Sequence, residues 1–138
     1  MNNYQKAIEN SNIVSKTDIN GIITFVNDEF CNLFGFTKDE LIGKNHNIIR
    51  HPDTPKENFE LLWNTILDKK VYKSTVKNIS KNGEDIYLNT TIIPILDEKE
   101  ENIVEFVAIR YDITNEVLLQ KELEEKQKII LTHITGFP

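Results

Sequence analysis

Runs of alternating or continuous apolar residues mark five strand-like segments. Two of them flank Asn20-Gly21 and two others flank Asn82-Gly83, and an Asn-Gly pair supplies the positive φ angles that a tight hairpin requires. In the last segment apolar residues point to both faces, which is typical of a central strand or of a sheet covered on both sides. The five segments are Ile13–Thr17, Ile22–Val26, Val71–Ile79, Glu84–Leu96 and Ile103–Ile113.

Capping residues and helical spacing predict helices between these strands. Asn27 is a good N-cap for a short helix that ends at Gly35, and Thr37 to Glu40 looks like a capping box for another that stops at Gly43. After an irregular, polar stretch, a longer helix follows Pro55. It runs to about Asp68, and its apolar face consists of Phe59, Leu62, Trp63, Ile66 and Leu67.

The two ends of the chain have a different character. Residues 2–10 form a short, weakly amphipathic helix at best. Asn115–Leu131 is charged and lacks Gly and Pro, and Leu119, Leu123 and Ile130 fit a loose heptad with Lys126 at the intervening core position. Two interpretations stay open: a solvated helix, or the start of a signalling coiled coil that continues past Pro138. We favour the coiled coil.

Composition narrows the class of protein. The 138 residues include 16 Lys and Arg against 22 Asp and Glu, a net charge of −6, so the chain lacks the electrostatic footprint of a nucleic-acid or anionic-lipid binder. No apolar run approaches the roughly 18 residues of a membrane span, and no secretory pattern is present. One cysteine, Cys31, excludes an internal disulfide framework. We therefore expect a cytoplasmic sensing or binding domain.

The order of elements favours an α+β fold. Two hairpin regions at the ends with helices between them predict an antiparallel sheet with helices gathered on one face. Such a sheet curls around its helices and leaves a hollow for a small molecule. We divide the chain into an N-terminal cap segment (1–10), a central domain (11–114) and a C-terminal helical linker (115–138) that leads to an output domain outside this chain.

Four motifs in this order resemble the PAS domain family and cover about residues 11–114. The resemblance implies a five-stranded antiparallel sheet with short helices on one face, and a C-terminal output helix launched by Asp112-Ile113-Thr114. The motifs are Asp18-Ile19-Asn20-Gly21-Ile22-Ile23 with Val26-Asn27; Phe34-Gly35-Phe36 with Glu40-Leu41-Ile42-Gly43; Lys81-Asn82-Gly83-Glu84; and Arg110-Tyr111-Asp112-Ile113-Thr114.

The irregular middle, Asn45 to Pro55, is similar to the PAS domain of bacterial aerotaxis receptors. That subfamily binds FAD non-covalently and reads its redox state. The resemblance implies that Arg50, His51 and Asp53 belong to the flavin site. Where the subfamily places a tryptophan at the start of the third strand, this chain has Tyr72, which can still stack on a ring system.

A flavin site needs an apolar slot, donors for phosphate and a group that responds to reduction. Arg50 can pair with phosphate or the flavin edge, His51 can sense charge, and Asp53 can orient either. Asn27 and Asn89 offer amide contacts. Candidates for the slot are Phe30, Phe34, Ile48, Leu62 and Trp63.

These residues also have structural interpretations. Arg50 and Asp53 can form a surface ion pair, Asp53 can cap the following helix, and Asn27 is equally suited to an N-cap. Trp63 is typical of a helix core, and the phenylalanines are core residues in either interpretation.

Other chemistries are less well supported. In light-oxygen-voltage domains, which are PAS relatives, a cysteine in a Gly-x-Asn-Cys-x-Phe motif attacks the flavin, and here His46 occupies that position while Cys31 lies in an earlier helix. His46 or His51 can ligate haem iron, which ranks behind flavin. No motif for a metal site or a catalytic nucleophile is present, and we expect no enzymatic activity from this segment.

The leading hypothesis is therefore a PAS sensory domain that binds FAD, responds to redox or oxygen state and acts as a homodimer through its sheet and terminal helices. The alternatives are a cofactor-free PAS module for dimerisation and relay, and a haem-based gas sensor.

Overall fold

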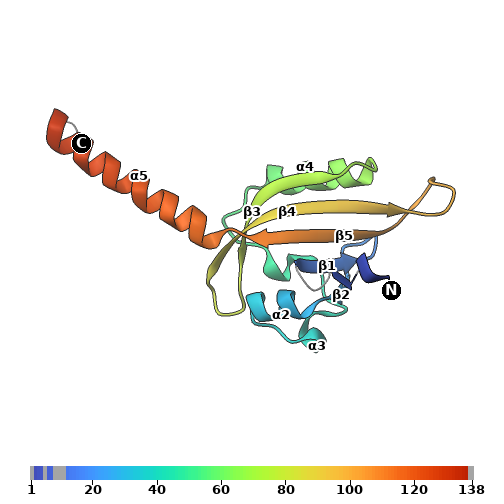
Figure 1. Cartoon of the computed structure of the whole chain (residues 1–138). Coiled ribbons are helices and arrows are strands. Elements are labelled where there is room, and N and C mark those ends of the chain that lie inside the picture. Colours follow the sequence, from blue (N-terminus) through green and yellow to red (C-terminus); the bar gives the residue numbers. More distant parts are fainter. Residues whose placement is uncertain (1, 5, 8–11, 137–138) are drawn as a thin grey trace.

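The computed structural model describes residues 2–4, 6–7 and 12–136. Five antiparallel strands form one sheet in the order β2-β1-β5-β4-β3, with β5 in the middle. Figure 1 shows the sheet curling, with α2 and α3 on one side and α4 alongside β3. The expected five-stranded antiparallel sheet with helices is confirmed. The strands are β1 (Ile13–Thr17), β2 (Ile23–Val26), β3 (Tyr72–Ile79), β4 (Asp85–Leu96) and β5 (Ile103–Asp112).

The helices begin and end where local chemistry dictates. Asn27 caps α2 (Asp28–Phe34) by accepting from the Phe30 amide, and Gly35 ends it with φ +80°. Thr37 and Glu40 form the expected capping box of α3 (Lys38–Leu41). The stretch expected to be irregular contains a 3₁₀ helix, η1 (His46–Ile49), capped by Asn45.

Helix α4 (Lys56–Leu67) packs against β3 and β4. Ile66 is buried and Phe59, Leu62 and Trp63 are half-buried, as the apolar spacing predicts. Leu67 departs from that prediction, since 56% of its surface is exposed. It is the last residue of α4 and lies beyond the arc that faces the sheet.

The hydrophobic core lies below the sheet and is built around α2. Its cluster combines Phe30 and Phe34 with strand residues and with Leu41 and Ile49; the two rings lie 4.6 Å apart between centroids. Ile48 and Cys31 pack against the cluster at its edge. The cluster also includes Ile86 and Leu88 of β4.

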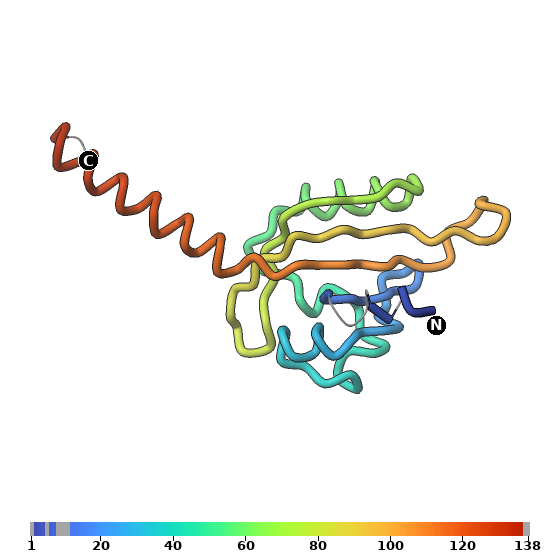
Figure 2. The backbone as a smooth tube through the Cα atoms, viewed as in Figure 1, coloured from blue at the N-terminus to red at the C-terminus, as the bar shows by residue number. Residues whose placement is uncertain are grey.

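Helix α5 (Thr114–Thr135) projects away from the body of the molecule, as the tube in Figure 2 makes plain. Of the expected N-terminal segment, residues 3–4 and 6–7 are helical, while residues 1, 5 and 8–10 lie outside the described residues. In the part of the chain that the structure describes, no helix is both long and apolar enough to cross a membrane.

Candidate functional site

A cavity of about 300 Å³ lies between the inner face of the sheet, α4 and η1, and we call it the main cavity. Strands β1, β4 and β5 contribute alternate residues, since successive side chains of a strand point to opposite faces, and β3 contributes Val76, Lys77 and Asn78. Trp63 closes one side from α4, with its ring edge-to-face with Phe106 at 5.9 Å. Residues that line it include Ser15, Thr17, His46, Asn78, Thr90, Phe106 and Arg110.

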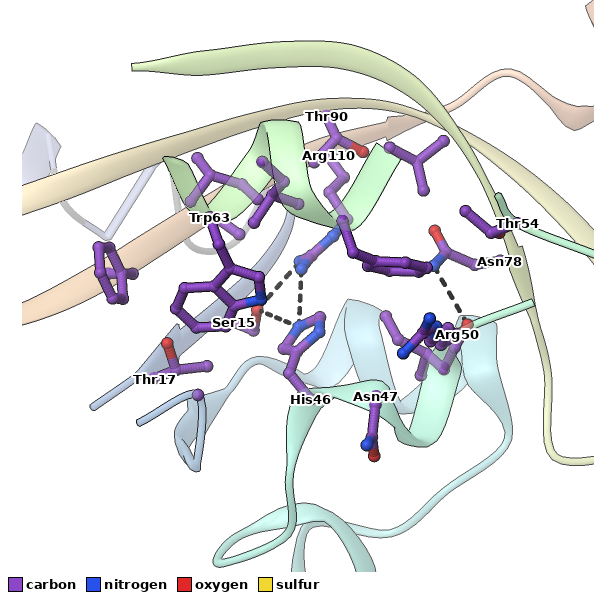
Figure 3. Close-up of a pocket in the computed structure, with 18 of the residues that line it drawn as sticks. Ser15, Thr17, His46, Asn47, Arg50, Thr54, Trp63, Asn78, Thr90 and Arg110 are labelled. Atoms are coloured by element: carbon purple, nitrogen blue, oxygen red, sulfur yellow. Dashed lines mark hydrogen bonds between the residues drawn. The ribbon is translucent and has the colours of Figure 1, made fainter. Parts of the chain in front are cut away.

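Arg110 is the centre of a polar cluster on the wall of the main cavity. Its Nη1 donates to Ser15 Oγ at 3.0 Å and its Nη2 donates to His46 Nε2 at 2.8 Å. Ser15 Oγ also lies 3.1 Å from the same histidine nitrogen. Figure 3 shows Arg110, His46 and Ser15 converging beside Trp63. The cluster joins β1, β5 and η1, which are remote in sequence.

This cluster holds a buried positive charge without a carboxylate. Arg110 is 3% exposed, and among the described residues it forms no ion pair. Burial lowers its pKa from 12.5 to about 9. Burial, together with the Arg110 charge, lowers the pKa of His46 to about 3, so the imidazole is neutral and its Nε2 accepts from Arg110. The cavity wall therefore offers one buried guanidinium to whatever occupies the space.

Arg50 lies at the mouth of the main cavity. Its side chain is exposed, and its Cζ lies 3.5 Å from the centroid of the Phe59 ring. The backbone at Arg50 forms a bridge with that of Asn78, whose Nδ2 donates to the Ile49 carbonyl at 3.1 Å. The η1 segment is thus attached to β3, and the attachment sets the position of the Arg50 guanidinium over the ring.

His51 lines the main cavity, but both of its ring nitrogens have protein partners. Nε2 lies 2.8 Å from Asp85 Oδ1, and Nδ1 accepts from the Asp53 amide at 3.0 Å. Nδ1 therefore carries no proton, and Nε2–H donates to the carboxylate. The pKa of Asp85 is lowered, chiefly by this hydrogen bond and secondarily by Lys77. The geometry makes His51 a clamp between the segment after η1 and β4.

The remaining residues expected at the site lie in several places. Trp63 lines the main cavity, whereas Phe34 and Ile48 belong to the core and its edge. Asn27 is buried as the α2 cap, and its Oδ1 accepts from the Phe30 and Val14 amides. Asn89 lies opposite Tyr111 on the outer, exposed face of the sheet, so it does not reach the main cavity.

A second cavity of about 230 Å³ adjoins the first, between α4 and β3. Tyr72 and Asp53 line this second cavity and not the main one. The Asp53 carboxylate is 78% exposed and lies 3.9 Å from Lys77 Nζ. The expected site residues are thus split between two cavities, the core and the outer face.

Several residues of the main cavity were not identified from the sequence as site residues. They are Ser15, Thr90 and Arg110, and His46 was considered only for haem and for the cysteine position of light-oxygen-voltage domains. A signal for Arg110 does exist: Phe106, Ala108 and Arg110 alternate along one strand, so the arginine shares the inward face of two apolar residues.

Comparison with known proteins agrees with this architecture. A sequence model of the PAS domain family matches residues 10–115. The aerotaxis receptor of Escherichia coli is 33% identical over 114 residues, covering 83% of this chain and 22% of the receptor. A blue-light photoreceptor of Listeria innocua is 38% identical over 106 residues, covering 77% of this chain and 41% of that protein. The chain thus spans 22% and 41% of the length of these two relatives.

Solved structures show the same fold. A light-oxygen-voltage domain of a blue-light activated histidine kinase from Erythrobacter litoralis superposes with a TM-score of 0.68 at 22% identity, covering 75% of this chain and 96% of that domain. The sheet with its helices and the sequence match to the family cover the same central part of the chain. This chain belongs to the PAS domain family and forms a sensory domain of the kind found in bacterial signalling proteins.

Proposed function

We propose that this chain binds FAD non-covalently in the main cavity and senses its redox state. The observation that carries the proposal is the buried Arg110 guanidinium, which has no carboxylate among the described residues and lines a cavity beside Trp63. A buried cation is costly unless paired, so a ligand that presents an electron-rich edge would compensate it. The resemblance to aerotaxis receptors supports flavin as that ligand.

The dimensions and walls of the main cavity fit the flat ring of a flavin. About 300 Å³ lies at the lower end of the range for small-molecule sites, enough for the ring system but not for a dinucleotide. Trp63, Phe59 and Phe106 supply aromatic walls, and Thr90 and Asn78 supply polar groups at its edge. The rest of the cofactor would leave through the mouth beside Arg50.

Redox sensing is favoured over a light-driven cysteine adduct. The one cysteine of the chain, Cys31, packs against the core and does not line the main cavity, and burial raises the pKa of its thiol. His46 lies where a light-oxygen-voltage domain has its nucleophile. Bound flavin would supply electron-transfer chemistry, and Arg110 would interact most strongly with the form that carries more negative charge.

A haem site receives no support from either candidate histidine. Nε2 of His46 accepts from Arg110, a cation that would oppose an iron centre at the same atom. Both ring nitrogens of His51 are engaged with Asp85 and Asp53.

The route to the output helix starts at the same arginine. Arg110 lies on β5 shortly before Asp112, whose Oδ1 accepts from the Thr114 amide and hydroxyl at the start of α5. Thr114 Oγ1 accepts from the Tyr87 amide, and Lys121 Nζ lies 2.7 Å from the Tyr87 hydroxyl. A change in the partners of Arg110 would therefore alter the strand that holds the first turns of α5.

The proposal retains the wider setting expected from the sequence. Residues 11–114 form the sensor and residues 115–138 the linker to an output domain beyond this chain. The protein acts in the cytoplasm, as a homodimer and as a regulatory module rather than an enzyme.

The test is the visible spectrum of the purified chain, recorded before and after reconstitution with FAD and FMN. We expect flavin bands in the blue. A chain that takes up no flavin on reconstitution would overturn the proposal and leave the cofactor-free relay module, and an intense Soret band would indicate haem.

A matched pair of variants tests the role of Arg110. Arg110→Met removes the buried cation at similar volume, and we expect lower flavin retention and a lower midpoint potential, because the reduced ring loses a stabilising charge. Lys73→Met removes an exposed cation on the outer side of β3 and serves as the control. Equal potentials for the two variants would remove Arg110 from the sensing mechanism.

A further inference from the structure

The second cavity adjoins the main cavity and shares part of its wall. Five residues line both of them: Thr54, Phe59, Leu62, Val76 and Lys77. The ring of Phe59 stands at this junction and carries the Arg50 guanidinium on its face. A ligand that fills the main cavity thus has an adjoining space of about 230 Å³ beside α4 and β3.

Two basic side chains, Arg50 and Lys77, lie at the junction. Arg50 has no ion pair among the residues that the structure describes, and its planar guanidinium suits bidentate contacts with phosphate. Lys77 Nζ lies 3.6 Å from Asp85 and 3.9 Å from Asp53, so these two carboxylates share its positive charge. Arg50 is therefore the group at the junction that suits a pyrophosphate, with Lys77 beside it.

The second cavity has walls suited to a nucleobase and its sugar. Tyr72 from β3 and Phe59 from α4 supply aromatic surface, on which a base can stack. Asn58 and Ser74 supply amide and hydroxyl groups at the same wall.

We infer that the second cavity binds the adenosine half of FAD, with the pyrophosphate at Arg50 and Lys77 and the adenine against Tyr72. This inference rests on the proposed flavin binding in the main cavity and adds the specificity of the site: the domain selects the dinucleotide over FMN. It also assigns Tyr72 to the adenine instead of to the flavin ring.

The experiment measures the dissociation constants of FAD, FMN and riboflavin for the flavin-freed chain by fluorescence titration. We expect FAD to bind more tightly than FMN. Tyr72→Ala should weaken FAD binding about tenfold and leave FMN and riboflavin binding unchanged, since only the dinucleotide reaches Tyr72. Tyr72→Phe keeps the stacking surface and should restore FAD binding.

Tyr111→Ala is the matched control, because Tyr111 is 60% exposed on the outer face of β5. Thermal unfolding of each flavin-free variant checks that the fold persists. If the chain binds flavins but prefers neither FAD nor FMN, or if Tyr72→Ala weakens all three ligands equally, the adenosine site is overturned while the proposed function stands. If none of the three flavins binds, both fall.

Discussion

At the scale of single residues, the informative feature is a buried arginine that stays charged beside a histidine that stays neutral. Arg110 keeps a charge in a buried position, and His46 beside it is held neutral. Ser15 completes the cluster from the neighbouring strand. Charge sensing at His51 stays a prediction; in the structure the ring nitrogens of His51 contact Asp85 and Asp53, and His46 contacts Arg110.

The pH dependence of stability tests this cluster. Burial and the Arg110 charge lower the pKa of His46 from 6.5 to about 3. The unfolded chain therefore binds a proton below about pH 6.5 that the folded chain does not bind, and the free energy of unfolding falls as pH drops from about 6.5 towards 3. We expect His46→Gln, whose amide oxygen can still accept from Arg110, to flatten this dependence in urea titrations between about pH 7 and pH 5.

His133→Gln is the control, since His133 is exposed on α5. Carboxylates contribute to the pH dependence of the free energy of unfolding only at lower pH. The pKa of Asp85 is lowered from 3.8, chiefly by His51, and that of Glu40 is lowered from 4.5, chiefly by Lys81. Identical slopes for wild type and His46→Gln would show that His46 is protonated in the folded chain.

At the scale of elements, the β1–β2 turn positions a wall of the main cavity. Asp18 Oδ1 accepts from the Asn20 and Ile22 amides, and Gly21 takes a φ of +82°. The indole of Trp63 packs directly on this turn. A Cβ added at Gly21 would lie only 3.3 Å from two atoms of the ring. The glycine is thus required both by its backbone conformation and by the neighbouring tryptophan.

Two glycine substitutions separate these effects. Gly21→Ala and Gly83→Ala should each lower the free energy of unfolding by about 1–2 kcal/mol, because both glycines lie in the left-handed region. Only Gly21→Ala should also reduce flavin retention, because its Cβ displaces Trp63, whereas nothing lies within 4 Å of a Cβ at Gly83. Urea unfolding and the ratio of bound flavin to protein check both points; equal flavin loss in the two variants would contradict the role of Trp63.

At the scale of the whole molecule, a compact sensor is joined to a helix that buries little of itself. Leu119, Leu123 and Ile130 on α5 are 67%, 49% and 57% exposed, and their spacing gives one stripe interrupted by Lys126. An isolated amphipathic helix gains little stability from propensity alone, so the stripe favours pairing with the same helix of a second copy. Homodimerisation stays a prediction.

The lysine in the stripe offers a direct test. Lys126→Leu should strengthen self-association, because it replaces a charge at an inner position with an apolar side chain. Lys128→Leu adds the same side chain away from the stripe and should leave association unchanged. Sedimentation equilibrium over a concentration series measures both; equal association of the two variants would argue against pairing through α5.

Much of the fold was predictable because its determinants are local. Asn-Gly turns, the Asn27 cap, the Thr37 capping box and the apolar spacing of α4 each depend on residues a few positions apart. The strands were placed to within one or two residues of their ends for the same reason. The site was less predictable, because Ser15 and Arg110 are brought together by the pairing of β1 with β5, and His46 reaches them from η1.

The order of elements, the antiparallel sheet and the family can be read from the chain, since turn chemistry, capping and periodicity act over short distances. Which side chains share a cavity depends on how the elements assemble. The curl of the sheet turns Arg110 inward and leaves Asn89 outside, and the η1 segment gives His51 to Asp85 and His46 to Arg110. Alternation along β5 indicates that Arg110 shares the face of Phe106 and Ala108, but pairing across remote strands is a property of the assembled sheet, and no local pattern contains it.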